Sequence, residues 1–409
     1  MQRTPDVKAV FKHRFAYTPT HLLKVPGGLE LLGNHAAYNQ GLGLTLAIDR
    51  YVHIAASPRN DGRIEIVSSA LLHEPEKFWL SELKPNPAAP WADPVKAVLE
   101  QLREAGVLFR GFNLALHNTI PEGLGGRGAL AVAVAMMVRQ LYPHRLTEHG
   151  TARPPKRDRR GQLPQLTSRE RLAYAELCAA ALNDGEPADA DLSGPVTSLF
   201  GKEFHAVQMD YLHHNTERLP LIGEIAVVLC DSGLRHPHAA TFTRQLRRLC
   251  AGAAAKIGTR SLRSVELTDL NAAKSKLTPR EYACAYHIVG ETQRGVFAER
   301  ALREEDLVQF GQYLLQSHDS SREYFRNSSA ELDLLVDLAR EHPACLGARL
   351  SGDGYGGATV NLVAWTQADS FIKAMGENYQ ARTGQPLKTM RCKIVDGAEY
   401  KSQRSAFRG

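Results

Sequence analysis

The stretch KVPGGLELLGNHAAYNQGLGLTLAIDR, residues 24–50, decides how the rest of the chain is interpreted. Its glycines, asparagines and single histidine are typical of a ligand-binding loop, because glycine allows backbone conformations and close approaches that other residues do not. A loop of this kind needs charge where it meets a charged ligand, yet most of its positions are uncharged. We therefore expect the framework of a binding site here, with part of its chemistry missing.

A second glycine-rich segment, EGLGGRGAL at 122–130, follows the alternating, strand-like FNLALHNTI at 112–120 and opens a strongly apolar helix. A turn between a strand and a helix presents backbone N–H groups and the positive end of the helix dipole, which together bind anions. The GK[ST] ending of a P-loop is absent, and close packing of the helix accounts for the glycines equally well. The candidate nucleotide-binding residues are Gly123, Gly125, Gly126, Arg127 and Gly128.

A third segment, SGDGYGGA at 351–358, has four glycines within a frame that is otherwise strand-like. A hairpin turn requires only one or two glycines. The surplus indicates that something approaches the backbone at this loop, whose candidate site residues are Ser351, Gly352, Asp353, Gly354 and Gly356.

The composition, 409 residues with 43% hydrophobic and 23% charged, is that of a globular protein with a proper core. The first residues lack the apolar core of a secretory signal, and no run approaches the roughly 18 apolar residues of a membrane span. We expect a cytoplasmic protein with no membrane partner. The six cysteines are dispersed, with no CxxC pair, so we expect a reducing compartment and cysteines that act as buried small hydrophobic residues.

The net charge of +6 is concentrated in TARPPKRDRRGQLPQ at 151–165, which has the prolines and glycine of an exposed loop. It lacks the aromatic residues of a nucleic-acid site, so no nucleic-acid partner is expected. The histidines at 213–214 and 236–238 have no cysteine or carboxylate company, and we predict no metal site of their own.

Strands and helices alternate along the chain. The hydrophobic pattern predicts a strand pair over 44–57, a helix over 91–106, a buried strand over 224–232, helices over 238–256 and 278–316, and a strand, turn and strand over 346–365. This order predicts two α+β domains, residues 1–210 and 211–409.

Three motifs in order resemble those of the galactokinase branch of the GHMP kinase superfamily. PGG at 26–28 and GNHAAYNQG at 33–41 are similar to the family's Pro-Gly-Arg and Gly-Glu-His-Thr-Asp-Tyr-Asn core. GLGGRGAL resembles its Gly-Leu-Ser-Ser-Ser-Ala loop, and GARLSGDGYGG at 347–357 resembles its third motif. The resemblance covers nearly the whole chain. It implies a ribosomal-protein-S5-like N-terminal domain, a ferredoxin-like α/β C-terminal domain, and a sugar kinase that uses ATP and Mg²⁺.

Several functional positions of the family carry other residues here. The resemblance places the family's arginine at Gly28 and its catalytic aspartate at Gly194, the latter within SGPVTSLFG at 193–201. The loop serines correspond to Gly125, Gly126 and Arg127. The sugar-contacting segment retains His35, Tyr38 and Asn39, but has Asn34 and Ala37 in place of acidic residues, and Thr243 in place of a tyrosine.

Two hypotheses follow from this pattern. The first is a kinase-impaired or non-catalytic homologue that binds a sugar or nucleotide-type ligand in a pocket between its domains. The second is an active ATP-dependent sugar kinase, with relocated catalytic residues or an altered sugar; a different reaction at the same pocket is a third. Residues that could take over the missing roles are Asp191 and Arg127, with Asp189, Lys24, Arg14 and Asp353 as further charges.

Overall fold

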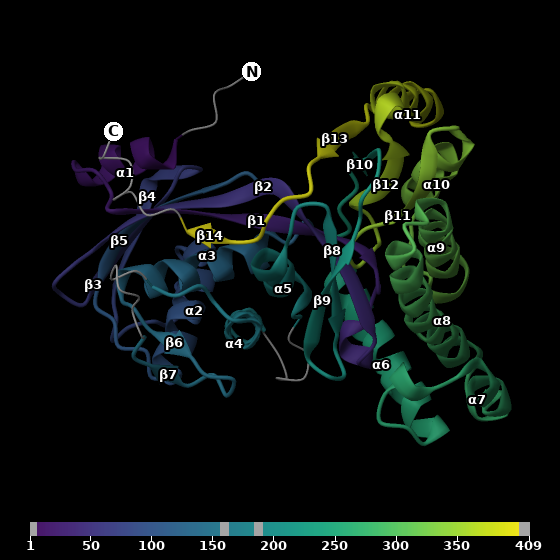
Figure 1. Ribbon diagram of the computed structural model, residues 1–409, viewed down its shortest axis with the longest axis horizontal. Coiled ribbons are helices and arrows are strands. Elements are labelled where there is room, and N and C mark those ends of the chain that lie inside the picture. The colour runs from purple at the N-terminus through teal and green to yellow at the C-terminus, as the bar shows by residue number, and fades with distance from the viewer. Residues whose placement is uncertain (1–5, 156–162, 184–190, 401–409) are drawn as a thin grey trace. The chain divides into compact units, whose positions relative to one another are not determined.

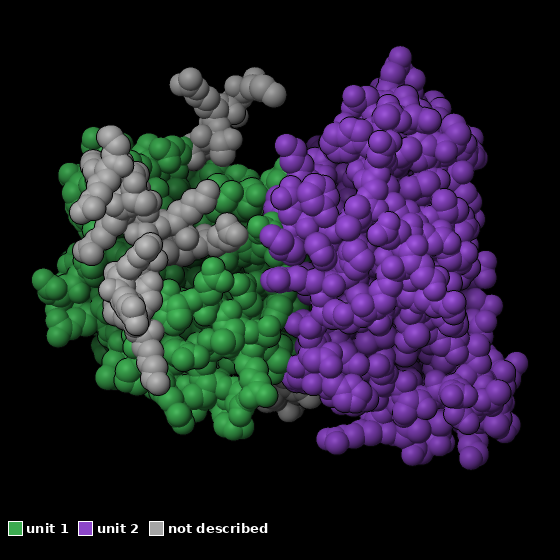
Figure 2. Space-filling view, viewed as in Figure 1, with its two compact units in different colours: residues 1–28, 49–201, 396–409 green, residues 29–48, 202–395 purple. Residues whose placement is uncertain are grey.

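The computed structural model describes residues 6–155, 163–183 and 191–400. The chain divides into two compact units (Figure 2). Unit 1 consists of residues 1–28, 49–201 and 396–409, and unit 2 of residues 29–48 and 202–395. The chain therefore passes between the units four times, after residues 28, 48, 201 and 395, and the first passage lies inside the first motif. The sequence predicted one boundary, at 210, and did not anticipate the exchanged segments.

Unit 1 is a sheet with helices packed on it (Figure 1). The strands follow the order β14-β1-β2-β5-β3-β4, in which β3 and β5 are parallel. Phe11 of α1 packs against Ala55 and Ala115, while α2, α3, α4 and α5 contact one another. The strands are β1 (His21–Leu32), β2 (Leu42–Pro58), β3 (Arg63–Ser68), β4 (Leu71–Trp79), β5 (Phe112–Asn118) and β14 (Glu399–Tyr400), with a small pair β6 (Arg145–Leu146) and β7 (Ala152–Arg153). The helices are α1 (Val7–Phe15), α2 (Asp93–Glu104), α3 (Gly126–Leu141), α4 (Ser168–Ala181) and α5 (Ser193–Phe200).

Unit 2 contains an antiparallel sheet of order β11-β12-β10-β13, and its helices include the long α8. The sheet core joins strand residues such as Val228 to Phe371 of α11, and a second core joins α6 to α8. The strands are β8 (His205–Asp210), β9 (Asn215–Pro220), β10 (Ile225–Asp231), β11 (Cys345–Leu350), β12 (Ala358–Ala364) and β13 (Lys388–Cys392). The helices are α6 (Ala239–Ile257), α7 (Leu267–Ala272), α8 (Pro279–Arg303), α9 (Leu307–Ser320), α10 (Ala330–Glu341) and α11 (Ala368–Thr383).

The helix expected over 91–106 is present as α2, and its apolar positions Val95, Val98, Leu99 and Leu102 are all fully buried. The strand predictions for β5, β10, β11 and β12 are also confirmed. The order of elements is thus largely what periodicity indicated.

Two local predictions were wrong. Residues 44–57 form one strand rather than a pair, because β2 changes partner along its length, from β8 at residues 42–45 to β5 at residues 52–58. Residues 24–32 belong to strand β1 rather than to a loop. The predicted helical segment over 278–316 is present as two helices, α8 and α9, because Glu305 adopts a positive φ of 58° and Asp306 caps the start of α9.

Of the helices within residues 6–155, 163–183 and 191–400, none combines the length and hydropathy that crossing a membrane requires. The basic segment at 151–165 begins with the short strand β7, and residues 156–162 within it lie outside the described part of the chain.

Candidate functional site

Gly28, which the sequence resemblance places at the family's arginine position, contacts the glycine-rich loop that precedes α3. The N–H of Gly28 donates to the carbonyl oxygen of Leu124 at 3.1 Å. A Cβ at Gly27 would lie 2.8 Å from the same oxygen, and a Cβ at Gly125 would lie 3.1 Å from the nitrogen of Gly28. Gly125 also has a φ of 70°, which favours glycine. Strand β1 and this loop therefore meet backbone to backbone.

Gly194, which the sequence resemblance places at the family's aspartate position, lies in α5 against the first turn of α3. A Cβ at Gly128 would lie 2.9 Å from the carbonyl carbon of Gly194, and a Cβ at Gly194 would lie 3.4 Å from Cα of Gly128. Ser198 in turn donates to the carbonyl oxygen of Pro26 at 2.7 Å, which ties α5 to β1. We call Gly28, Gly125, Gly128 and Gly194 the glycine cluster.

The glycine cluster retains one feature that binds anions. Helix α3 begins after Gly125 with no side-chain cap, and the first N–H groups of any helix lack partners within that helix. The dipole of this 16-residue helix adds partial positive charge at the same end. Phosphate oxygens fit such an end, whereas Gly123 to Gly128 carry no side-chain oxygen with which to ligate Mg²⁺.

The two proposed substitutes in unit 1 have local interactions. Asp191 accepts from the N–H of Ser193 at 2.8 Å and from its hydroxyl at 2.9 Å, so its carboxylate holds the start of α5. Arg127 is exposed, and its guanidinium lies 3.5 Å from the carbonyl oxygen of Leu182. The carboxylate of Asp191 and the guanidinium of Arg127 are therefore both engaged in contacts within unit 1.

The further charges considered near the arginine position are also engaged. Arg14 donates to the carboxylate of Glu65 at 2.7 Å, and the ammonium group of Lys24 lies 4.6 Å from the ring centre of Tyr51. Asp189 lies outside the described residues.

In unit 2, the side chains of the first motif are bonded to the loop of the third motif. Asn34 donates to the carbonyl oxygen of Gly352 at 2.5 Å and accepts from the amide of Asn327 at 2.6 Å. Nε2 of His35 lies 3.1 Å from the carbonyl oxygen of Asp353. Both Asn34 and His35 are buried. Their polar atoms are thus matched to backbone and amide groups of the same unit.

His35 is held in place by the two other residues that the motif retains. The hydroxyl of Tyr38 lies 3.1 Å from Nδ1 of His35, and the amide of Asn39 donates to its carbonyl oxygen at 3.0 Å. The Arg247 guanidinium lies 4.6 Å from the ring centre of Tyr38. Burial lowers the pKa of His35, which favours a neutral ring that donates from Nε2 to Asp353 and accepts at Nδ1 from Tyr38.

A fully buried carboxylate, Glu291 of α8, binds the backbone of this motif. One of its oxygens accepts from the N–H groups of Gly33 and Asn34, at 3.0 and 3.3 Å, and the other accepts from Arg294 at 2.6 Å. Burial acts to raise the pKa of Glu291, but the charge of Arg294, with those of two further basic groups, holds it well below its usual range. Sequence reasoning missed this residue, although an acidic residue within the apolar HIVGETQR segment was an available signal.

A second carboxylate, Glu30, pairs with the fully buried Arg349 at 3.3 Å. Arg349 also donates to the carbonyl oxygen of Leu31 at 3.1 Å, which joins β11 to β1. Burial raises the pKa of Glu30 to about 7, even though Arg349 and Asn34 act to lower it. We call Glu30, Asn34, His35, Glu291, Asn327 and Arg349 the polar cluster of unit 2.

The surplus glycines of the third motif face the chain itself. Gly354 has a φ of 88°, and a Cβ there would collide with the carbonyl oxygen of Asn327. A Cβ at Gly356 would lie 2.8 Å from the carbonyl oxygen of Leu234. The expectation that something approaches this backbone is met by neighbouring segments of unit 2, so these glycines need no ligand to explain them.

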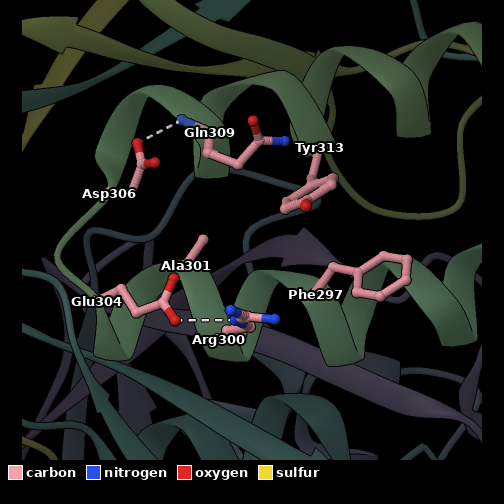
Figure 3. A pocket seen from close by; sticks show the side chains of 7 residues that line it. All are labelled: Phe297, Arg300, Ala301, Glu304, Asp306, Gln309 and Tyr313. Carbon is pink, nitrogen blue, oxygen red and sulfur yellow. Dashed lines mark hydrogen bonds and ion pairs between the residues drawn. The ribbon is translucent and has the colours of Figure 1, made fainter.

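A surface pocket of about 310 Å³ in unit 2 lies where α8 ends and α9 begins (Figure 3). Its charges are paired locally, since Arg300 bonds Glu304 at 2.8 Å and Asp306 accepts from the N–H of Gln309 at 2.9 Å. None of the predicted site residues lines it. The lining residues are Phe297, Arg300, Ala301, Glu304, Asp306, Gln309 and Tyr313.

Comparison with known proteins identifies the family. Residues 9–58 match the galactokinase galactose-binding signature, and residues 298–381 match the GHMP kinase C-terminal domain. The chain is 32% identical over 402 residues to a galactokinase of Chloroflexus aurantiacus, covering 96% of each chain. The chain belongs to the galactokinase family of GHMP kinases.

Further relatives agree. The human galactokinase is 29% identical over 383 residues, covering 91% of each chain. In fold, the chain is similar to Lactococcus lactis galactokinase, solved with galactose, with a TM-score of 0.84 at 22% identity over 97% of this chain and 99% of that one. A mevalonate kinase structure is similar in fold, with a TM-score of 0.61 at 14% identity over 92% of this chain and 99% of that one. The predicted family and the predicted two-domain α+β GHMP kinase fold are confirmed.

Among the described residues of this galactokinase homologue, no group of three or more histidine, cysteine or acidic side chains is placed to hold a metal ion. The residues that sequence reasoning did not single out are Leu124, Glu291, Asn327 and Arg349, all of which act through backbone contacts or buried charge.

Proposed function

We propose that this galactokinase homologue binds a sugar or nucleotide-type ligand and is impaired in phosphoryl transfer. The observation that supports this most directly is the glycine cluster. The positions that the family fills with arginine, aspartate and a serine converge in unit 1, and each of them carries hydrogen in place of a side chain.

Phosphoryl transfer from ATP depends on charge at the reacting groups. A cation stabilises the transferring phosphoryl group, a carboxylate positions or deprotonates the attacking hydroxyl, and Mg²⁺ neutralises the phosphates. The start of α3 retains donors for the phosphates of ATP. The glycine cluster supplies neither the cation nor the carboxylate, and Gly123 to Gly128 offer no ligand for Mg²⁺.

The expected loss is large. Removal of one electrostatic stabiliser costs about 10²- to 10³-fold in rate, and loss of a general base about 10²- to 10⁴-fold, although such effects are not additive. Even the larger single effect takes an enzyme of ordinary turnover, about 10 s⁻¹, to a rate too slow for metabolic flux.

The second candidate function is an active ATP-dependent sugar kinase. It is favoured by one observation, the 32% identity over 96% of the chain to a protein named galactokinase. It requires Arg127, Asp191 or another charge to move from its present contacts to the reacting groups.

One assay separates the two. Purified protein is incubated with ATP, Mg²⁺ and a panel of sugars that includes galactose, and ADP release is followed, with an active galactokinase as the assay control. We expect turnover below about 0.1 s⁻¹, against the usual range of about 1 to 10³ s⁻¹. Sugar-dependent turnover above that value would overturn the proposal in favour of the active kinase.

Binding is tested separately by thermal unfolding with each ligand alone. A ligand that binds only the folded protein raises its stability, by about 2.7 kcal/mol at a hundred times its dissociation constant. A raised midpoint with ATP or with a sugar, without turnover, is the expected result. No shift with any of them at millimolar concentration would contradict the binding part of the proposal.

A further inference from the structure

The glycine-rich turn between β11 and β12 is held in place by the polar cluster of unit 2. The carbonyl oxygen of Asp353 lies 3.1 Å from Nε2 of His35 and accepts from the amide of Asn327 at 3.0 Å. The carbonyl oxygen of Gly352, one residue earlier, accepts from the amide of Asn34 at 2.5 Å. The backbone that carries the Asp353 side chain is therefore fixed by three buried polar groups.

The side chain of Asp353 takes no part in holding this turn. Asp353 is exposed, and in the part of the chain that the structure describes its carboxylate forms no hydrogen bond and no ion pair. The two carboxylates of the polar cluster differ in this respect, since Glu30 pairs with Arg349 and Glu291 with Arg294. An ionised carboxylate accepts up to about four hydrogen bonds and donates none. Asp353 therefore presents an acceptor that is available to a ligand.

The motif side chains beside Asp353 are already engaged. The side chain of Asn34 donates to Gly352 and accepts from Asn327, and both ring nitrogens of His35 have partners. These groups cannot receive the hydroxyl groups of a ligand without breaking bonds that hold the turn. The Asp353 carboxylate can accept them without breaking any.

Aromatic rings belong to the same turn and to the start of α6. Tyr355, two residues after Asp353, has a φ of 60°, and its N–H donates to the carbonyl oxygen of Asn327 at 2.6 Å. The ring centre of Tyr355 lies 4.9 Å from that of Phe242 and 6.4 Å from that of His236. Tyr355 and Phe242 are partly exposed, and His236 is exposed. The turn thus combines a charged acceptor with an aromatic surface that reaches solvent.

We infer that Asp353 binds the hydroxyl groups of a neutral sugar, and that the ligand at this turn is a sugar rather than a nucleotide. This inference rests on the proposed ligand-binding function and narrows its ligand class. Sugar hydroxyls donate to the carboxylate in charge-assisted hydrogen bonds of about 2.5–2.7 Å. The C–H groups on one face of the sugar ring pack on the aromatic surface. A nucleotide is disfavoured here, because the carboxylate repels its phosphates.

The test measures binding of D-galactose and of ATP, each alone, to the full chain by isothermal titration calorimetry. We expect Asp353→Asn to bind galactose about 10- to 100-fold more weakly than the wild-type protein, because hydrogen bonds to a charged acceptor are lost. Its ATP affinity and its unfolding midpoint should not change, because the carboxylate has no partner in the described structure. Asp369→Asn is the matched control, since that carboxylate is 94% exposed on α11, and should bind galactose like the wild type.

The outcomes separate this inference from the proposed function. Equal galactose affinity in the wild type and Asp353→Asn would overturn the inference and leave the binding function standing, as would a wild-type protein that binds ATP but not galactose. A titration with ATP and Mg²⁺ in which Asp353→Asn loses affinity would assign the carboxylate to the metal ion instead. Binding of neither ATP nor any sugar by the wild type would overturn both proposals.

Tyr355 provides a second readout. Tyr355→Phe keeps the ring and should bind galactose like the wild type, whereas Tyr355→Leu removes the aromatic face and should weaken binding by up to about tenfold. The unfolding midpoint of each variant without ligand shows whether it is folded. Equal galactose affinity in Tyr355→Leu and the wild type would show that the sugar does not pack on this surface.

Discussion

The glycine cluster of unit 1 and the polar cluster of unit 2 share the first motif, yet they have opposite chemistry. In the glycine cluster, backbones touch at Gly28, Gly125 and Gly194, where the sequence resemblance places charged or hydroxyl side chains. In the polar cluster, nearly every motif side chain is buried and bonded to another part of unit 2. Backbone contacts thus define the glycine cluster, whereas hydrogen bonds and ion pairs between buried side chains define the polar cluster.

The largest expected effect concerns the polar cluster. In Glu291→Gln, Arg294 loses its buried carboxylate partner, and breaking a buried pair typically costs about 3–5 kcal/mol. Urea unfolding should show this as a lower midpoint. Glu304→Gln, which breaks the exposed pair with Arg300 on the same helix, is the control and should change little. If the two variants are equally stable, the buried pair of Glu291 and Arg294 does not make the expected contribution to stability.

The next effect concerns the glycine cluster. Gly128→Ala places a Cβ 2.9 Å from the backbone of Gly194, and overpacking of this kind costs about 1–3 kcal/mol. Gly376→Ala in α11 is the matched control, because nothing lies within 4 Å of that Cβ. The control should stabilise the helix by up to about 1 kcal/mol. If Gly128→Ala is as stable as Gly376→Ala, the two helices are free to separate and the cluster is not closely packed.

A pH dependence distinguishes the two clusters, since the glycine cluster has nothing to titrate. The pKa of Glu30 rises from 4.5 to about 7 on folding, so the folded state binds more protons between these values. Its contribution to stability is complete below about pH 4.5 and is lost as the pH rises through 7, an effect of the order of 1–3 kcal/mol. Unfolding midpoints between pH 5 and 8 measure it. Glu30→Gln should reduce the change of the unfolding midpoint with pH, and the control Glu377→Gln, at an exposed position, should not. A pH dependence that Glu30→Gln leaves unchanged would show that Glu30 is not its source.

The smallest effect is expected from restoring two family residues. The double variant Gly28→Arg with Gly194→Asp introduces a cation and a carboxylate, and the Cβ of the new aspartate would lie 3.4 Å from Cα of Gly128, in ordinary van der Waals contact. We expect less than a tenfold gain in ADP release, because the loop hydroxyls are still missing and Asn34 and His35 remain bonded to the third-motif loop. A gain of 10³-fold would mean that the rest of the site is intact.

Much of the fold could be predicted from the sequence. Periodicity located α2 and β5, a continuous apolar run located β10, and a glycine-rich turn between two apolar segments located the β11–β12 hairpin. Periodicity failed for β2, whose two halves pair with different strands. Strand β2 remains one strand because it exchanges partners, and a pattern within one strand contains no information about its neighbours.

The candidate site was predictable in part. The motif residues that meet were identified, since His35 and Asp353 are in contact, as are the glycines of the loop and Gly28. The supporting groups were not, because Glu291 and Arg349 act across long sequence separations, and Asn327 acts through backbone and amide contacts that composition does not reveal.

The contact between Gly128 and Gly194 also constrains the two positions unequally. The sequence resemblance places alanine at the first position and aspartate at the second, and this chain has glycine at both. A Cβ at position 128 would lie 2.9 Å from the backbone of α5, whereas a Cβ at position 194 would lie 3.4 Å from Cα of Gly128. The packing therefore bars even the smallest side chain at position 128 while leaving room for a Cβ at position 194.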